Sequence, residues 1–569
     1  MATKKIAKAR QSQLVTTYGV GSLFPATDQS FMIMGTDYWS EWSPKLEEVR
    51  LARALGVNFF RTPPAGRVSG DVPVTRFPLM HYCTKCHRLG RLQELAEDGT
   101  MECRACDLNL VPSRFVACCE AGHIEDFPYW AWVHRGQEVV GDAHRLTLRS
   151  LGRTSSLADI EIACSCGIPP RSMAGSFGKE ALVQVQGCKG KRPWLPTDQQ
   201  TPCDRPLRTL QRGSSNVWFA SMRSTISIPP WSTAVAALVA HHWKILQNLP
   251  DSAMEAVIVP LVGRDPGISV DSVRAAIARK RGVFEKVPPT DGELRAEEYE
   301  ALCVGTGPVS DSALDHFICE PRIVAEDLLG LIAQVSSVGR LREVRALEGF
   351  TRVVPIMPNE ERKPAPLSES VSDWMPAIEV HGEGIFVRIR EDAVREWEST
   401  SKARSRARLL DEAQRVRDAA LHRPPSVPVA PRFVALHSLA HILLNEVSLH
   451  AGYPAASLRE RVYAADGQAG ILIYTASSDA AGSLGGLAAL AATDRFAAVF
   501  RAAIQRAAWC SSDPVCCEST GSGAESLNLA ACHACLLLPE TSCEHRNVFL
   551  DRVSVTGSVN EPQTGLVAT

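Results

Sequence analysis

The stretch Cys83-Thr-Lys-Cys86, followed sixteen residues later by Cys103-Arg-Ala-Cys106, decides how this part of the chain folds. Two residues between paired cysteines let both sulfurs reach one metal ion from a tight turn. A second pair on a facing turn completes a tetrahedron around zinc and leaves no open position for water. The spacing therefore predicts a zinc ribbon over residues 81–110, with a structural ion bound by Cys83, Cys86, Cys103 and Cys106.

A second group of cysteines predicts another zinc site, although its spacing is less regular. Cys-x-Cys with two distant partners is a weaker pattern than paired Cys-x-x-Cys motifs. We expect one ion here, bound by Cys164, Cys166, Cys188 and Cys203. Three residues nearby could replace one of these ligands: Cys118, Cys119 and His123.

A third group lies near the C-terminus and contains the knuckle Cys532-His-Ala-Cys535. Cys517 directly follows Cys516, and one peptide unit makes it difficult for both to bind one ion. Cys543 is the alternative to the two upstream ligands. The predicted set is Cys510, Cys516, Cys532 and Cys535, which brings the expected total to about three structural zinc ions.

The N-terminal sequence and the hydropathy favour zinc over disulfides for these cysteines. Residues 1–10 are basic but lead into Gln11-Ser12-Gln13, without the apolar core of a signal peptide. The most apolar run, 234–240, ends at two histidines and is too short to span a bilayer. We therefore expect a cytoplasmic protein without membrane association, and a reducing compartment favours zinc.

Length and periodicity predict an α+β multidomain chain of 569 residues. We expect a β-rich N-terminal half with zinc ribbon-like knuckles, a helical middle and an α/β C-terminal domain with the third zinc site. Helical patterns in the middle include residues 272–283, 292–302, 323–335 and 392–421. The predicted regions are 1–80, 81–110, 111–230, 231–421, a proline-rich linker at 422–432, and 433–569.

The net charge of −2 gives no general attraction to nucleic acid, so DNA contacts would need a local patch. One linear candidate lies on the helix predicted at 392–421. Its basic residues face several directions, which is typical of a solvated surface, but they are the best candidates for phosphate contacts: Lys402, Arg404, Arg406 and Arg408.

Two motifs imitate catalytic sites. Asp411-Glu-Ala-Gln414 resembles the magnesium-binding box of helicase motors, but that box needs a preceding strand and a phosphate loop. A helix is predicted before it, and no Gly-x-x-x-x-Gly-Lys-Ser/Thr occurs in the sequence.

The glycines from Gly482 to Gly486 fit a strand-to-helix turn better than a phosphate site. We therefore expect that the chain is not an enzyme.

His437 and His441 are four residues apart on a predicted helix, a spacing that can bind a catalytic metal. The general-base glutamate of a His-Glu-x-x-His protease would stand at position 438, which is Ser438. A packed helix is the simpler interpretation. A metal-dependent hydrolase or nuclease using His437 and His441 is the alternative function.

Several strings resemble a known family. They are Arg10–Gly21, Gly122–Pro128, Cys510–Cys516, Ala531–Cys535 and Glu540–Cys543. Together they resemble the DrmB family, subunits of the bacterial anti-phage system DISARM, over nearly the whole chain. The C-terminal region is similar to a cysteine-bearing domain of unknown function that also occurs behind the motors of repair-type helicases.

The resemblance implies a partner and a role. DrmB proteins are expected to work with DrmA, a Swi/Snf-like helicase, in a complex that engages DNA during phage restriction. Because this sequence has no motor, the motor would be supplied in trans. The resemblance assigns no catalytic residue. It implies a non-catalytic zinc-binding subunit that associates with a DrmA-like helicase and contributes to DNA engagement.

Overall fold

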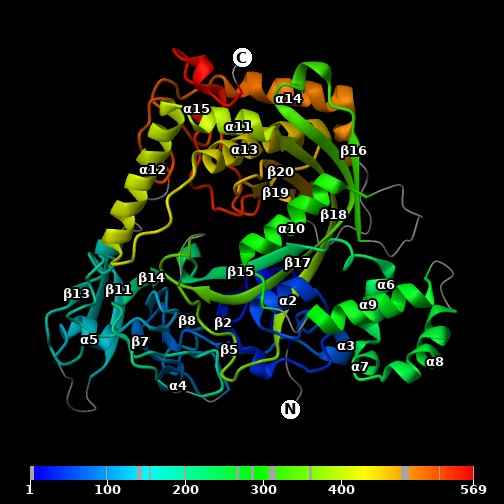
Figure 1. The fold of residues 1–569 in the computed structure, drawn as a ribbon. Coiled ribbons are helices and arrows are strands. Elements are labelled where there is room, and N and C mark those ends of the chain that lie inside the picture. The colour runs from blue at the N-terminus through cyan, green and yellow to red at the C-terminus, as the bar shows by residue number, and fades with distance from the viewer. Residues whose placement is uncertain are drawn as a thin grey trace.

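The fold has two lobes joined by two long strands, β17 (Ile332–Thr351) and β18 (Trp374–Ile389) (Figure 1). Residues from the C-terminal part of the chain form the upper lobe, and the N-terminal half forms much of the lower lobe. The computed structural model describes residues 5–97, 99–137, 144–152, 156–197, 200–263, 268–283, 287–306, 316–357, 360, 362–475, 486–523 and 526–567.

The N-terminal half is rich in short strands, as the sequence predicts. Three sheets have the orders β1-β2-β5, β10-β9-β14 and β13-β12-β11-β7-β6-β8. Their strands are β1 (Leu23–Ala26), β2 (Gln29–Ile33), β5 (Val74–Arg76), β6 (Met80–Tyr82), β7 (Arg88–Arg91), β8 (Val111–Pro112), β9 (Phe115–Cys118), β10 (Ile124–Asp126), β11 (Leu146–Ser150), β12 (Ile160–Cys164), β13 (Arg171–Ser172) and β14 (Arg208–Gln211).

A larger sheet of eight strands runs through the centre of the molecule, with the order β15-β17-β18-β20-β19. β16 pairs with β17, and β4 pairs with both β18 and β3. The pairs are antiparallel except β4 with β18, which is parallel. The remaining bounds are β3 (Lys45–Leu46), β4 (Phe59–Arg61), β15 (Phe219–Ile226), β16 (Phe317–Arg322), β19 (Leu458–Tyr463) and β20 (Gly470–Thr475).

Helices surround these sheets, and their ends follow ordinary capping rules. The Thr290 hydroxyl accepts the N–H of Glu293, whose carboxylate returns to the Thr290 N–H, so a capping box starts α10. The helices are α1 (Gln13–Thr16), α2 (Val49–Leu55), α3 (Gly66–Ser69), α4 (Leu92–Leu95), α5 (Tyr129–Val133), α6 (Ala234–His241), α7 (Trp243–Leu246), α8 (Asp251–Val262), α9 (Val270–Val283), α10 (Asp291–Val304), α11 (Glu391–Glu398), α12 (Ser401–Ala420), α13 (Pro431–Ala451), α14 (Thr493–Ala507) and α15 (Arg552–Thr556). No helix within the described residues is long and apolar enough to cross a membrane.

The middle of the chain is less helical than the sequence predicts. The helix expected over 323–335 is wrong: a 3-10 turn covers Glu326–Leu328, and β17 starts at Ile332. β17 is buried on both faces, and a continuous apolar run does not distinguish a buried strand from a helix.

The long helix expected over 392–421 is two helices, α11 and α12. The break falls at Thr400, whose hydroxyl accepts the N–H of Ala403 and caps α12. The proline-rich segment expected as a linker has no helix or strand before α13 starts at Pro431. Gly482–Gly485, part of the expected glycine turn, lie outside the described residues.

Arg352 ties three distant segments of the lower lobe together. It is fully buried, and its guanidinium donates to the carbonyl oxygens of Gly122 at 2.8 Å, Val217 at 2.7 Å and Gly21 at 2.7 Å. The same group lies 4.8 Å from the ring centroid of Phe350. Arginine suits this position because its planar fork can satisfy several acceptors at once.

We predict that Arg352→Met destabilises the protein by roughly 3–5 kcal/mol, because three buried carbonyls lose their donor. Urea unfolding followed by tryptophan fluorescence would show a lower midpoint. Arg404→Met, at an exposed position, is the control and should change stability by only about 0.5 kcal/mol or less. An unchanged midpoint in Arg352→Met would contradict this assignment.

Candidate metal centres

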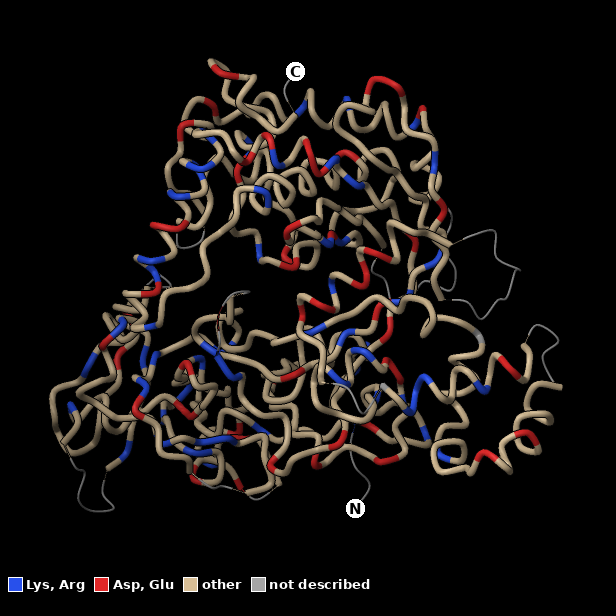
Figure 2. The backbone as a smooth tube through the Cα atoms, viewed as in Figure 1, with Lys and Arg blue, Asp and Glu red and all other residues tan. Residues whose placement is uncertain are grey.

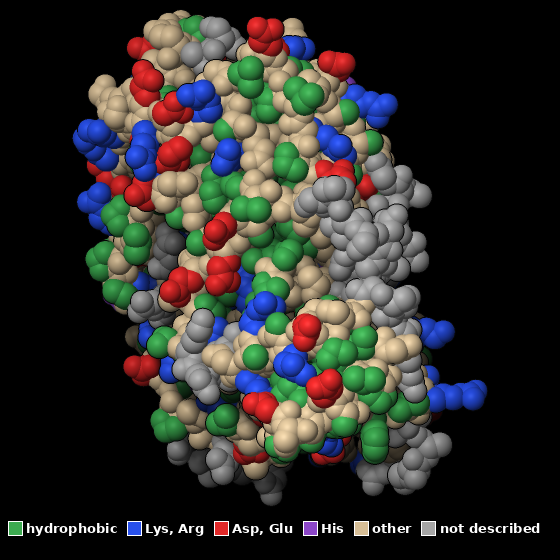
Figure 3. Space-filling model, turned by 45° about the vertical axis from the view of Figure 1, so that its right-hand side comes forward, with side chains coloured by type: hydrophobic (Ala, Val, Ile, Leu, Met, Phe, Trp, Pro, Cys, Tyr) green, Lys and Arg blue, Asp and Glu red, His purple; other side chains and the backbone are tan. Residues whose placement is uncertain are grey.

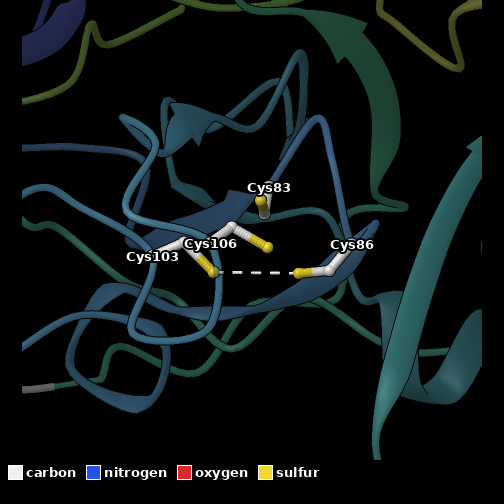
Figure 4. A group of neighbouring side chains, drawn as sticks. All are labelled: Cys83, Cys86, Cys103 and Cys106. Atoms are coloured by element: carbon white, nitrogen blue, oxygen red, sulfur yellow. Dashed lines mark hydrogen bonds between the residues drawn. The ribbon is translucent and has the colours of Figure 1, made fainter.

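The ribbon cysteines lie together as the sequence predicts (Figure 4). Cys83 follows β6 and Cys86 precedes β7, so this hairpin directs both thiols to one side. Cys103 and Cys106 face them, with Cys86 Sγ 3.7 Å from Cys103 Sγ. The four sulfurs all lie within 4.8 Å of one another.

The two knuckles of the ribbon have the same backbone conformation. His87 follows the first pair with φ at 61°, and Asp107 follows the second pair with φ at 55°. Each of these residues donates its N–H at 2.9 Å to the carbonyl of the first cysteine in its pair, Cys83 or Cys103. This repeated left-handed turn points both sulfurs of a Cys-x-x-Cys pair at one centre.

The third group also lies together, with the ligands that the sequence favours. Cys510 Sγ lies 3.5 Å from Cys532 Sγ, and Cys516 Sγ lies 3.8 Å from Cys535 Sγ. Cys532 and Cys535 are 3.7 Å apart at sulfur. Cys543, the alternative ligand, belongs to a different cluster.

Asp513 holds the backbone of the segment that carries Cys510 and Cys516, the first two cysteines of the third group. Its carboxylate accepts the N–H groups of Cys510 at 2.9 Å and Cys517 at 3.0 Å. Arg552 donates to both oxygens of this carboxylate, at 2.7 and 2.8 Å. The Cys517 thiol turns away and donates to the Pro514 carbonyl at 3.3 Å, so Cys517 is not part of the cluster.

The second group does not form one site, which corrects the sequence-based prediction. Cys188 and Cys203 lie with Cys119 and His123. His123 Nδ1 is 3.4 Å from Cys119 Sγ and 3.6 Å from Cys188 Sγ, and Cys119 is 3.9 Å from Cys203 at sulfur. Strand β9 carries its last residue, Cys118, into a different apolar cluster from Cys119, because successive side chains alternate in direction.

The other half of that group, Cys164 and Cys166, lies with two histidines that are not among the predicted ligands, His134 and His144. Cys164 Sγ is 3.3 Å from His144 Nδ1, and Cys166 Sγ is 3.4 Å from His134 Nε2. His134 uses its other ring nitrogen on the Trp130 carbonyl at 2.8 Å, which leaves Nε2 free to bind a metal.

Sheet register explains these partners. Leu146 pairs with Cys164 between β11 and β12, so His144, two residues before Leu146, lies on the same face as Leu146 and Cys164, and its ring reaches the Cys164 sulfur diagonally. Cys119 and His123 flank the turn between β9 and β10. The sequence offers Cys119 and His123 as replacement ligands, and their place on either side of a short hairpin turn is the signal that could have joined them to Cys188 and Cys203.

The four groups described so far have the donor sets of structural zinc. Two groups consist of four cysteines each, one has three cysteines and a histidine, and one has two cysteines and two histidines. All four supply a complete tetrahedron from protein atoms, so none needs a water ligand.

The thiol pKa values of the ribbon group show how its four sulfurs oppose one another's ionisation. Burial would raise the pKa of Cys83, but backbone N–H groups of Cys86 and Lys85 lower it to about 7. Partial burial and the neighbouring sulfurs raise the pKa of Cys106 to about 12. One thiolate in a group therefore opposes ionisation of the others, and a bound dication would remove this conflict.

The basic residues suggested for DNA contact occupy two different environments on α12. Lys402 forms an ion pair with Glu561, and Arg406 Nη2 donates to buried Asp551 at 2.7 Å. Arg404 and Arg408, one turn apart, are exposed. The Asp-Glu-Ala-Gln box lies inside α12, where Asp411 accepts the N–H of Val429 at 2.7 Å.

A cleft of about 1690 Å³ has walls from both lobes, and most of its cations are already paired. Arg223 pairs with Asp291, and Arg295 pairs with Glu544 at 2.9 Å. Acidic and basic residues are interspersed along the chain (Figure 2) and over the face shown in Figure 3. These views fit the nearly neutral net charge.

Comparisons with known proteins agree with these features. Residues 10–219 match a domain of unknown function, DUF8724, and residues 439–536 match the MrfA Zn-binding domain. The DISARM protein DrmB of Bacillus paralicheniformis is 30% identical over 561 residues, which cover 93% of this chain and 96% of that protein. The crystal structure of the DUF1998 helicase MrfA bound to DNA matches 37% of this chain and 22% of its own at 12% identity, with a TM-score of 0.18.

The donor sets and the zinc-binding domain define a protein with structural zinc as its cofactor. The sequence predicts about three ions, and the division of the second cysteine group into two brings the groups described so far to four. The near full-length match identifies the family more narrowly: the chain belongs to the DrmB family of DISARM proteins.

We predict that Cys166→Ser and Cys188→Ser each remove one zinc ion and that the double variant removes two, because the two cysteines belong to separate clusters. Metal analysis of purified protein by mass spectrometry measures this directly. Cys118→Ser, next to a proposed ligand but outside the clusters, should keep the full count. Loss of only one ion in the double variant would restore the single-site interpretation.

Proposed function

We propose that this chain is a non-catalytic, zinc-binding subunit of an anti-phage defence complex. It would associate with a DrmA-like Swi/Snf helicase and contribute to DNA engagement. The observation that carries the proposal is the match to the DISARM protein DrmB over 93% of the chain. The metal groups support it, because closed sets of four ligands fit a scaffold better than a reaction centre.

The alternative function, a hydrolase using His437 and His441, has less support. Both imidazoles have no exposed surface, and all four members of their cluster are buried. A catalytic metal needs a position that water or substrate can reach. ATP hydrolysis by this chain is also disfavoured, since its sequence contains no phosphate loop.

Reconstitution tests the proposal. The full chain is co-expressed with a DrmA-like helicase, and each protein and the pair are assayed for DNA binding and ATP hydrolysis. We expect a stable complex, DNA-stimulated ATPase activity only when the helicase is present, and tighter DNA binding by the pair. Hydrolysis of DNA or ATP by the isolated chain, or failure of the two proteins to associate, would refute the proposal.

For the DNA contact we propose Arg404 and Arg408, the two exposed members of the basic set on α12. Lys402 and Arg406 are less suitable because their charges are compensated by Glu561 and Asp551. An exposed pair one helical turn apart can reach neighbouring phosphates without breaking an internal ion pair.

We predict that Arg404→Gln with Arg408→Gln weakens DNA binding by the complex for all sequences alike. Each lost phosphate contact should reduce the slope of log affinity against log salt by about 0.9, to a total of about 1.8. Fluorescence anisotropy at several salt concentrations measures both effects. The control replaces Arg495 and Arg501, two exposed residues of α14, by Gln. An unchanged slope in the α12 variant would place the DNA contact elsewhere.

A further inference from the structure

A fifth group of metal-binding side chains lies in the core of the upper lobe, apart from the four thiolate-rich groups described above. It consists of His437, His441, Glu460 and Cys543. The two imidazoles and the carboxylate have no exposed surface, and Cys543 is 4% exposed. Burial of a carboxylate and a thiol together is costly unless a cation or complete hydrogen bonding compensates it.

Three structural elements bring these residues together. α13 presents His437 and His441 one turn apart, β19 supplies Glu460, and the segment after the Cys532–Cys535 knuckle supplies Cys543. The four candidate ligand atoms lie within 4.8 Å of one another.

The closest distances fit a small tetrahedral site. His437 Nε2 lies 2.9 Å from Glu460 Oε1 and 3.2 Å from Cys543 Sγ, and His441 Nε2 lies 3.2 Å from Glu460 Oε1. A tetrahedral zinc ion holds such atoms roughly 3.3–3.6 Å apart, as follows from its usual bond lengths. The site therefore needs only a few tenths of an ångström of expansion.

The hydrogen bond of His441 fixes which of its nitrogens faces the group. Nδ1 lies 2.8 Å from the carbonyl oxygen of Leu536, which can only accept, so Nδ1 carries a proton. In a neutral ring, Nε2 then presents a lone pair toward Glu460 Oε1. Two acceptors at 3.2 Å repel each other unless a cation or a second proton lies between them.

Hydrogen bonds alone leave this group incomplete. Within the described residues, Glu460 Oε2 and His437 Nδ1 are buried and have no hydrogen-bond partner. The Cys543 sulfur is already prepared for negative charge, because the N–H of Asn547 points at it from 3.3 Å. The same backbone-to-sulfur contact occurs at Cys188 and Cys510, both members of zinc-type groups.

We propose that His437, His441, Glu460 and Cys543 bind a fifth metal ion, a zinc-type dication in a closed structural site. One thiolate and one carboxylate would balance the charge of the ion, and two imidazoles would complete its four ligands. The Leu536 carbonyl orients His441 in the way that outer-shell groups orient metal-bound histidines. With all four ligands buried, the ion would hold α13, β19 and the C-terminal segment together.

Anomalous diffraction from crystals of the full-length wild-type protein tests the site directly. Data collected on both sides of the zinc absorption edge should give a peak between the four side chains. Peaks at the two four-cysteine groups, with none between His437 and Cys543, would overturn the proposal. This measurement does not depend on whether any variant folds.

Metal counting on variants provides the second test. Cys543→Ser should contain one zinc ion fewer per chain than wild type, whereas Cys517→Ser, a cysteine outside every cluster, should match wild type. If Cys543→Ser does not fold, Glu460→Gln, which keeps the side-chain shape and removes the charge, takes its place. A folded variant with the wild-type zinc count would overturn the proposal.

Discussion

The long antiparallel pair of β17 and β18 is the constraint on which the arrangement of the two lobes depends. Ile332 and Val335, near the start of β17, pack in the core of the upper lobe, whereas Leu347 and Phe350, near its end, pack in the lower lobe. One continuous ladder therefore enters both cores. A register shift between Val338 and Leu341 bends the pair where it passes from one lobe to the other. Separation of the two lobes would have to break this ladder.

Zinc would add to the stability given by the hydrophobic core in parts of the chain that have few helices or strands. Between β13 and β14 the chain has no helix or strand in its described residues, yet Trp194 and Leu195 are buried there. Cys188 and Cys203 flank this stretch and lie with Cys119 and His123 of the hairpin of β9 and β10, so an ion bound by these four residues would fasten the stretch to that hairpin. Backbone without a ladder or helix has little local order, and a metal tie supplies the missing constraint. Zinc in these groups would thus stabilise conformations that hydrophobic burial alone would leave open.

The sequence predicts the two four-cysteine groups and the β-rich N-terminal half because their signals are local. A Cys-x-x-Cys turn carries its own geometry, as the matching conformations of His87 and Asp107 show. The sequence does not predict the histidine partners of Cys164, because the pairing of β11 with β12 brings His144 to this cysteine. It offers Cys119 and His123 only as replacement ligands, and not as the set that Cys188 and Cys203 join. The helix expected before Val335 failed for a related reason. A strand buried on both faces has no alternating pattern to reveal it.

The C-terminal domain links two metal groups through one short segment. Cys535 belongs to the C-terminal four-cysteine group, and the next residue, Leu536, gives its carbonyl to His441 of the buried group. The same segment then turns and returns Cys543 to His437. A shift of the Cys532–Cys535 knuckle would therefore move the Leu536 carbonyl that orients His441. It would also move the Cys543 thiol beside His437. Because α13 carries both histidines and packs in the core reached by Ile332 of β17, the two metal groups and the inter-lobe ladder form one connected framework. A partner protein that contacts this domain would meet a surface fixed from within by metal coordination and by the sheet together.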